Sequence, residues 1–161
     1  MTPAIRALQQ AKARYKLHEY EHDPAAPSFS LECAAVLGVE PARVFKTLVA
    51  KVDGGNLVMG IVPASAHLDL KALAAAVGSK RAEMADPQAA QRATGYVLGG
   101  ISPLGCRRKL ATVLDRSAME HATILVSAGR RGLQIEIAPG ELLRLAGTTA
   151  APIAAAGSNP P

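Results

Sequence analysis

The sequence contains few aromatic residues, few cysteines and no long hydrophobic run. Aromatic side chains make up 3% of the 161 residues and tryptophan is absent, which argues against an RNA-binding surface built from stacked aromatic rings. The two cysteines, Cys33 and Cys106, have no CxxC spacing and form neither a zinc motif nor a disulfide framework, as is typical of a reducing compartment. No apolar run approaches the ~20 residues of a membrane span, and the first residues lack a signal-peptide core. We therefore expect a cytoplasmic protein without a membrane partner.

The composition is that of one globular domain. Hydrophobic residues make up 49% of the chain and charged residues 19%, which is typical of a folded protein rather than a disordered one. A chain of this length buries one substantial core without disulfides or metals. The formal net charge of +5 mildly favours an anionic partner such as RNA.

Apolar spacing and capping residues predict short helices that alternate with strands. The expected helices span 3–14, 29–37, 69–77, 87–95 and 141–146, and the expected strands span 15–22, 44–52, 57–62, 96–98, 112–114, 123–127 and 133–137. Hairpins are interspersed with helices, so we predict an α+β fold in which short helices surround a mixed, partly closed, barrel-like sheet. The predicted single domain covers residues 1–147, and the Ala/Pro/Gly-rich residues 148–161 are expected to form a flexible tail.

The most informative segment is residues 95–105 (GYVLGGISPLG). Its glycines permit backbone angles and close ligand approach that a Cβ atom forbids, so Gly99 and Gly100 are candidates for placing bare backbone N–H groups beside a ligand. A tight turn between two strands is the alternative. The cations Arg107, Arg108 and Lys109 follow directly and favour a negatively charged ligand such as a nucleic-acid backbone.

Lys46 is the most informative single residue. Strand alternation places it on one face with Leu48, Ala50 and Val52, whereas Thr47 lies on the other face. A cation on an otherwise apolar face either extends its charge to the rim or points into a pocket.

No pattern in the chain indicates a catalytic triad or a metal site. Ser127 ends a strand, where its hydroxyl either faces a cleft or belongs to a turn, and Ser102 lies outside any Gly-x-Ser-x-Gly elbow. His18, His22 and Asp23 would gather around a metal only on a helix, and the alternating pattern there favours a strand. We therefore expect neither a metal nor a cofactor.

Several motifs together resemble the YbaK/EbsC family of bacterial aminoacyl-tRNA deacylases, over residues 1 to about 145. They are YEHDP at 20–24, VFKTL at 44–48, LDLK at 68–71, EMADP at 83–87, the glycine segment 95–105, and RGL at 131–133 followed by IE at 135–136. The resemblance implies that Lys46 is the essential pocket lysine and that Gly99 and Gly100 hold the aminoacyl end of the substrate through backbone groups. It also implies that Tyr20 and Ser127 line the pocket.

Four further residues, Thr47, Ser102, Gln134 and Glu136, are additional site candidates. The family carries an acidic residue where this chain has Gln134. Alternation puts Glu136 on the same strand face as Gln134, so it is a candidate to replace that acid.

The activity implied by the resemblance is trans-editing of mischarged tRNA. Such a protein removes cysteine from Cys-tRNA(Pro), and Cys-tRNA(Cys) is a further candidate substrate. The substrate's own thiol attacks the ester, which gives cysteine thiolactone and free tRNA, and prolyl-tRNA synthetase is the implied partner. Two alternatives stay open: a non-catalytic module that binds tRNA or synthetase, and a deacylase for Ala-tRNA(Pro).

Overall fold

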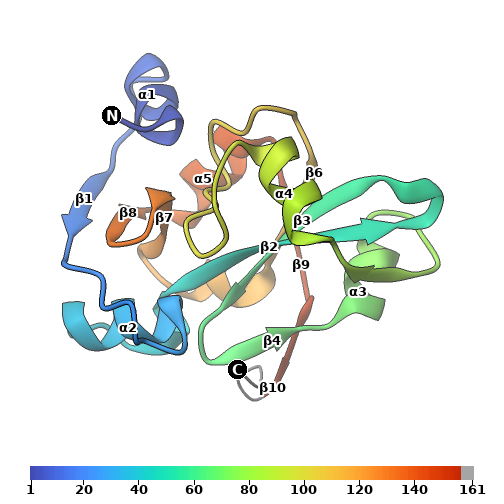
Figure 1. Cartoon of the computed structure of the whole chain (residues 1–161), viewed down its shortest axis with the longest axis horizontal. Helices are drawn as coiled ribbons and strands as arrows, with labels where there is room; N and C mark the ends of the chain where they lie inside the picture. Colours follow the sequence, from blue (N-terminus) through green and yellow to red (C-terminus); the bar gives the residue numbers. More distant parts are fainter. Residues whose placement is uncertain (157–161) are drawn as a thin grey trace.

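The computed structural model describes residues 1–156 and shows an α+β fold (Figure 1). Its helices are α1 (Pro3–Gln10), α2 (Phe29–Leu37), α3 (Leu70–Ala76), α4 (Pro87–Thr94) and α5 (Pro139–Ala146), with 3-10 turns η1 (Pro41–Arg43), η2 (Asp53–Gly55) and η3 (Arg116–Glu120). Most helices begin at the capping residues that the sequence indicates. The side chains of Thr2, Asp69 and Asp86 each accept a hydrogen bond from a backbone N–H in the first turn.

The strands form three sheets, and none of the three is closed into a barrel. An antiparallel sheet has the order β1 (Lys16–Glu19), β8 (Leu133–Ile137) and β7 (Ile124–Arg130). A mixed sheet has the order β5 (Ala82–Met84), β2 (Phe45–Val52), β3 (Leu57–Pro63), β6 (Ala111–Asp115) and β9 (Thr149–Ala151), and β10 (Ala154–Ala156) pairs with β4 (Ala66–Leu68). The predicted α+β class is confirmed.

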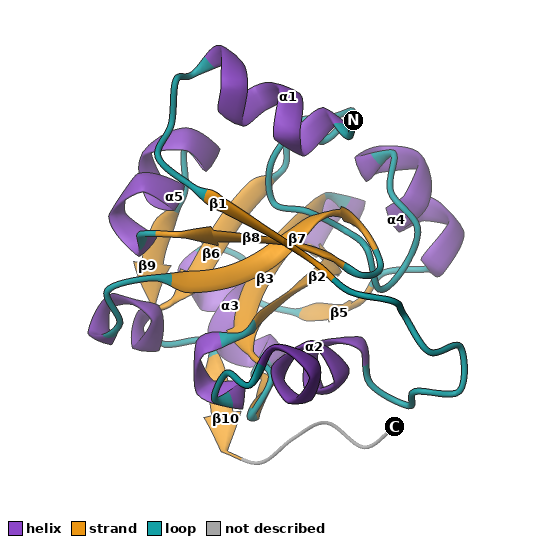
Figure 2. Ribbon diagram, turned by 90° about the vertical axis from the view of Figure 1, so that its left-hand side faces the viewer, coloured by secondary structure: helices purple, strands orange, loops and turns teal. Residues whose placement is uncertain are grey.

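The mixed sheet separates two apolar clusters. Phe45 and Val49 of β2 pack into the larger cluster, whereas Ala50 and Val52 pack into the smaller one. The side chains of β2 therefore alternate between two buried faces, as the sequence predicts. Figure 2 shows α1 and α4 at one end of the molecule and α2 and β10 at the other.

The expected helix 3–14 ends at Gln10, the expected strand 15–22 covers only Lys16–Glu19, and β4 and β5 were not expected. Two further segments differ in kind from the sequence-based expectation. Residues 96–98, expected to be a strand, belong to a loop in which the Tyr96 hydroxyl donates to the carbonyl of Leu104. Residues 149–156, expected to belong to a flexible tail, form β9 and β10 because the Asp115 carboxylate accepts the N–H groups of Ile153 and Ala154, each at 2.9 Å. Ile153 is also fully buried. The rest of the expected tail, residues 157–161, lies outside the described residues.

No helix within residues 1–156 has the length and apolar character needed to cross a bilayer.

Candidate functional site

A cavity of about 490 Å³ opens along one edge of β2. At one end of this edge β5 pairs with Ala50–Val52, and at the other end Val44 forms an isolated bridge with Leu125 of β7. The part of β2 between these two contacts, residues 45–49, has no partner strand on this edge and lines the cavity. The remaining walls come from the start of α2, residues 84–90, the loop 98–101, and two side chains of the β7–β8 hairpin. In Figure 1, α2 and α4 lie to either side of β2.

Lys46 lines this cavity, as the pocket interpretation of its strand position predicts. Among the described residues, none forms an ion pair or a hydrogen bond with its ammonium group. Burial lowers the pKa of Lys46 from its usual value, because a low-dielectric environment disfavours the charged form. Lys46 is also the one titratable side chain among the described residues that line the cavity. It supplies an isolated positive charge.

Thr47 presents unsatisfied polar groups to the same cavity. The carbonyl of Val49 accepts the N–H of Ala85 on the β5 side. Backbone groups alternate sides along an antiparallel strand, so the N–H and C=O of Thr47 point to this side as well, where β5 no longer extends. Its Oγ1 is buried and has no hydrogen-bond partner within the described part of the chain. A buried hydroxyl left unpaired costs about 1–3 kcal/mol.

Ser127 and Gln134 form the hairpin wall. They are opposite each other in the β7–β8 register, and both line the cavity. The Ser127 Oγ accepts the N–H of Gly129 at 3.1 Å. Tyr20 lies outside the lining, behind this wall, where its side chain hydrogen-bonds Gln134 and Cys33. Burial raises the pKa of Tyr20 well above its usual value, so the phenol stays protonated and supports Gln134 through a neutral contact.

The loop that carries Gly99 closes one side of the cavity, and it is held there by Phe29 and Arg131. The Arg131 guanidinium lies 4.3 Å from the centre of the Phe29 ring and donates to the carbonyl of Leu98 at 2.8 and 3.1 Å. A Cβ atom on Gly99 would lie 2.4 Å from Phe29 Cδ2, and one on Gly100 would lie 2.9 Å from Arg130 Cα. Both glycines are therefore required by packing within the protein. Sequence reasoning missed Phe29, and it used Arg131 only as part of a motif.

Two of the candidate residues lie away from the cavity. Ser102 is fully buried in its loop, where Oγ accepts the N–H of Leu104 at 3.3 Å. Glu136 accepts hydrogen bonds from Thr123 Oγ1 at 2.7 Å and His18 Nε2 at 2.8 Å. The Thr123 bond, followed by the His18 bond, lowers the pKa of Glu136. Because these contacts occupy both carboxylate oxygens, Glu136 does not stand in for an acid at position 134.

The described cavity lining contains hydroxyl groups but no histidine, carboxylate or cysteine. Activation of a serine hydroxyl requires an adjacent base, and Lys46 is the one lining side chain that carries a basic group. Neither cysteine lines this cavity, and burial raises the pKa of both Cys33 and Cys106 to about 11. At neutral pH these thiols are protonated and weakly nucleophilic. The site is therefore built to position a ligand and to place one positive charge beside it.

Comparisons with known proteins show similarity to aminoacyl-tRNA editing proteins. The profile of the aminoacyl-tRNA editing domain family matches residues 23–145. EbsC of Enterococcus faecalis, named as an inferred Cys-tRNA(Pro)/Cys-tRNA(Cys) deacylase, is 41% identical over 145 residues, which cover 89% of this chain and 87% of EbsC. The multifunctional Ser/Thr-tRNA deacylase ProXp-y of Escherichia coli K12 is 33% identical over 105 residues, covering 63% of each chain.

A solved structure shares the fold over nearly its whole length. It is described as an inferred trans-editing enzyme for prolyl tRNA synthetase, superposes with a TM-score of 0.81 at 25% identity, and the match covers 96% of this chain and 99% of the other. On the evidence of the family profile and of EbsC, this chain belongs to the aminoacyl-tRNA editing domain family.

Proposed function

We propose that this protein is a trans-editing deacylase that removes cysteine from Cys-tRNA(Pro), and also from Cys-tRNA(Cys), by using the thiol of the substrate. One observation carries the proposal: Lys46 is the one titratable side chain that lines the described cavity. A site without its own histidine, carboxylate or reactive thiol suits a substrate that brings its nucleophile. A cysteine thiol has a pKa of about 8.5 and is partly ionised at neutral pH, whereas a serine hydroxyl is not.

The reaction is an intramolecular transfer of the acyl group from oxygen to sulfur. The thiolate of the bound cysteine attacks its own ester carbonyl, a C–S bond forms, and the C–O bond to the terminal ribose breaks. The ribose oxygen takes up a proton, which balances the proton that the thiol has lost. The products are cysteine thiolactone and free tRNA. Holding the thiol against the carbonyl supplies most of the required rate, since well-oriented intramolecular reactions gain about 7–11 kcal/mol.

Residues on β2 would stabilise the charges that develop. The Lys46 ammonium orients the terminal ribose or its phosphate and lies beside the departing oxygen. Its lowered pKa makes it a stronger acid than an ordinary lysine. The N–H of Thr47, which faces the uncovered edge of β2, is suited to donate to the carbonyl oxygen as it becomes negative. Such preorganised donors contribute roughly 3–4 kcal/mol each in other acyl-transfer enzymes.

The hairpin wall and the loop would hold the aminoacyl group. Ser127 and Gln134 offer neutral polar contacts to the amino acid, with Tyr20 behind Gln134. The Gly99 loop closes over it, fixed by Arg131 and Phe29. Because this chain has few aromatic residues to read bases, we propose that tRNA selectivity comes from docking beside prolyl-tRNA synthetase, which forms the mischarged substrate.

A deacylation panel tests the proposal. We expect catalytic amounts of protein to release tRNA from Cys-tRNA(Pro) far faster than from Ala-, Ser- or Thr-charged tRNA(Pro), with thiolactone as the first product detected by mass spectrometry. S-methylation of the charged cysteine should abolish release. Equal rates for cysteine, serine and S-methylcysteine esters would overturn the thiol mechanism. Preference for the alanyl ester would indicate an Ala-tRNA(Pro) deacylase, and binding without turnover would indicate a non-catalytic module.

A further inference from the structure

The basic residues of this protein are concentrated in two segments that contain no acidic residue. Residues 1–18 and 87–114 hold eight of the eighteen lysines and arginines and none of the thirteen aspartates and glutamates. The other 115 residues contain ten basic and thirteen acidic side chains. The positive net charge of the chain therefore comes entirely from these two segments, which comprise α1 with the approach to β1, and α4 with the long loop that follows it.

All eight cations are exposed, and none forms an ion pair with a described residue. They are Arg6, Lys12, Arg14, Lys16, Arg92, Arg107, Arg108 and Lys109. We call this set the basic face. The nearest acids along the chain have other partners, since Glu19 pairs with Arg130 and Asp86 caps α4. No ion pair therefore neutralises these cations within the described protein, and the acid opposite Lys16 in the β1–β8 register, Glu136, is bonded to His18 and Thr123.

The two segments meet in the folded chain. Gly105 lies so close to α1 that a Cβ atom there would be 2.6 Å from the carbonyl carbon of Pro3. A second cavity, of about 360 Å³, is lined by Ala7 and Leu8 of α1 together with Arg108 and Lys109 of the loop. Figure 2 shows α1 and α4 at the same end of the molecule. The loop that carries Arg108 and Lys109 therefore adjoins α1.

This region borders the site cavity. The first residues of α4 and the loop residues Leu98 and Gly99 line the cavity, while Arg92 and Arg107 follow in the same helix and loop. On the other side, the Thr2 hydroxyl that begins α1 donates to the carbonyl of Ala128, the residue after the cavity-lining Ser127. The walls that enclose the aminoacyl group thus continue directly into the basic face.

We infer that the basic face binds the phosphate backbone of the tRNA acceptor stem and so directs its 3′ end into the Lys46 cavity. The inference rests on the proposed function for the identity of the RNA. Exposed cations without acids suit a phosphate backbone, whereas the centre of a protein interface is depleted of charge and enriched in aromatic side chains. Because phosphate contacts carry no sequence information, this face would bind different tRNAs alike.

Salt dependence gives the expected size of the effect. Each neutralised phosphate contributes about −0.9 to the slope of log K against log salt for a duplex. If all eight cations engage, affinity falls by about 2 × 10⁴-fold between 50 and 200 mM salt, and removal of three cations reduces that fall to about 500-fold. The slope itself should become less steep by about 2–3.

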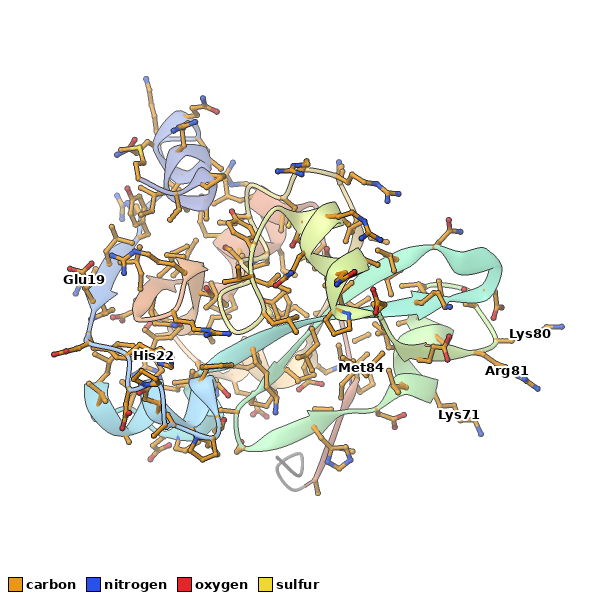
Figure 3. All side chains as sticks on the ribbon, in the orientation of Figure 1. Glu19, His22, Lys71, Lys80, Arg81 and Met84 are labelled. Atoms are coloured by element: carbon orange, nitrogen blue, oxygen red, sulfur yellow. The ribbon has the colours of Figure 1, made fainter. Side chains whose placement is uncertain are left out.

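The test compares matched triple variants by fluorescence anisotropy with uncharged tRNA(Pro). One variant carries Arg107→Gln, Arg108→Gln and Lys109→Gln, and a second carries Arg6→Gln, Arg14→Gln and Lys16→Gln. The control carries Lys71→Gln, Lys80→Gln and Arg81→Gln, which removes the same charge from a different, equally exposed edge beyond Met84 (Figure 3). Both basic-face variants should bind more weakly with a reduced salt slope, while the control keeps the wild-type slope.

A second measurement separates this inference from the proposed function. The basic-face variants should raise KM for Cys-tRNA(Pro) yet cleave 3′-cysteinyl adenosine, which has no phosphate, at the wild-type rate. If the protein binds tRNA through this face but deacylates no substrate, the inference about the basic face holds and the proposed function is wrong. An equal loss in the control variant, or unchanged tRNA binding with lost binding to prolyl-tRNA synthetase, would overturn the inference.

Discussion

The loop that closes the cavity should tolerate no side chain at Gly99. In Gly99→Ala the new Cβ would lie 2.4 Å from Phe29 Cδ2 and 3.0 Å from Arg131 Nε. Ordinary contacts start near 3.4 Å, so the loop or the Phe29 ring must move by about 1 Å. A displacement of this size near reacting groups lowers the rate by about 100-fold, equivalent to about 2.7 kcal/mol of transition-state stabilisation. The positive φ of +83° adds about 1–2 kcal/mol of backbone strain.

The variant Gly78→Ala is a control that carries the backbone strain of a positive φ without a steric displacement. Gly78 follows α3 with a φ of +76° and has no atom within 4 Å of a Cβ position, so alanine there carries the same backbone cost without a clash. Thermal unfolding should show both variants destabilised, with Gly99→Ala the more so. Steady-state deacylation of Cys-tRNA(Pro), measured well below both melting temperatures, should fall about 100-fold for Gly99→Ala alone. Normal turnover by folded Gly99→Ala, or an equal loss in Gly78→Ala, would refute a role of this loop in positioning.

Further predictions concern the titratable groups. Lys46→Met should abolish deacylation. The melting temperature should stay equal or rise, because burial lowers the pKa of Lys46 and the buried ammonium therefore destabilises the fold. Turnover near the wild-type rate would show that Lys46 has no role in the reaction. The rate of deacylation should rise with pH as the substrate thiol ionises near pH 8.5, and it should fall as Lys46 deprotonates at a pH below the usual lysine range. A rate that still rises above pH 10 would contradict a role for the Lys46 ammonium. Cys33→Ser and Cys106→Ser should remain active, alone and together, and loss of activity in a folded variant would indicate covalent catalysis. Glu136→Gln should keep full activity. Because hydrogen bonds lower the pKa of Glu136 in the folded protein, its carboxylate stabilises the fold above its unfolded pKa, and this contribution is lost as the pH falls through the lower folded value. Urea unfolding of Glu136→Gln should therefore show a weaker dependence on acid pH.

Local signals in the sequence predicted much of the fold. Helix 29–37 has the predicted bounds, because a serine cap and a glycine at the C-terminus define both ends. The β2–β3 hairpin follows from alternation around an Asp-Gly-Gly turn. By contrast, β9 and β10 depend on two hydrogen bonds to Asp115, and a contact over nearly forty residues leaves no local pattern.

The candidate site was also predictable only where local sequence patterns determine it. Alternation along β2 placed Lys46 on one face and Thr47 on the other, yet both line the cavity because β5 leaves that edge of the strand open. The partial coverage of an edge is a tertiary property. The same holds for Phe29 and Arg131, which meet across about a hundred residues. Sequence reasoning therefore identified the side chains that carry charged or polar groups and missed the side chains that enclose them.

The neutral residue at position 134 bears on the choice of mechanism. A carboxylate in the hairpin wall would offer a base to activate water or a hydroxyl. Gln134 provides no such base, and the nearest acid on its face, Glu136, is held by Thr123 and His18. An opposite charge close to Lys46 would favour its ammonium form and raise its pKa, whereas burial lowers that pKa here. An unpaired lysine with no acid beside it therefore supports the proposed mechanism, in which the site stabilises charge and the substrate supplies the nucleophile.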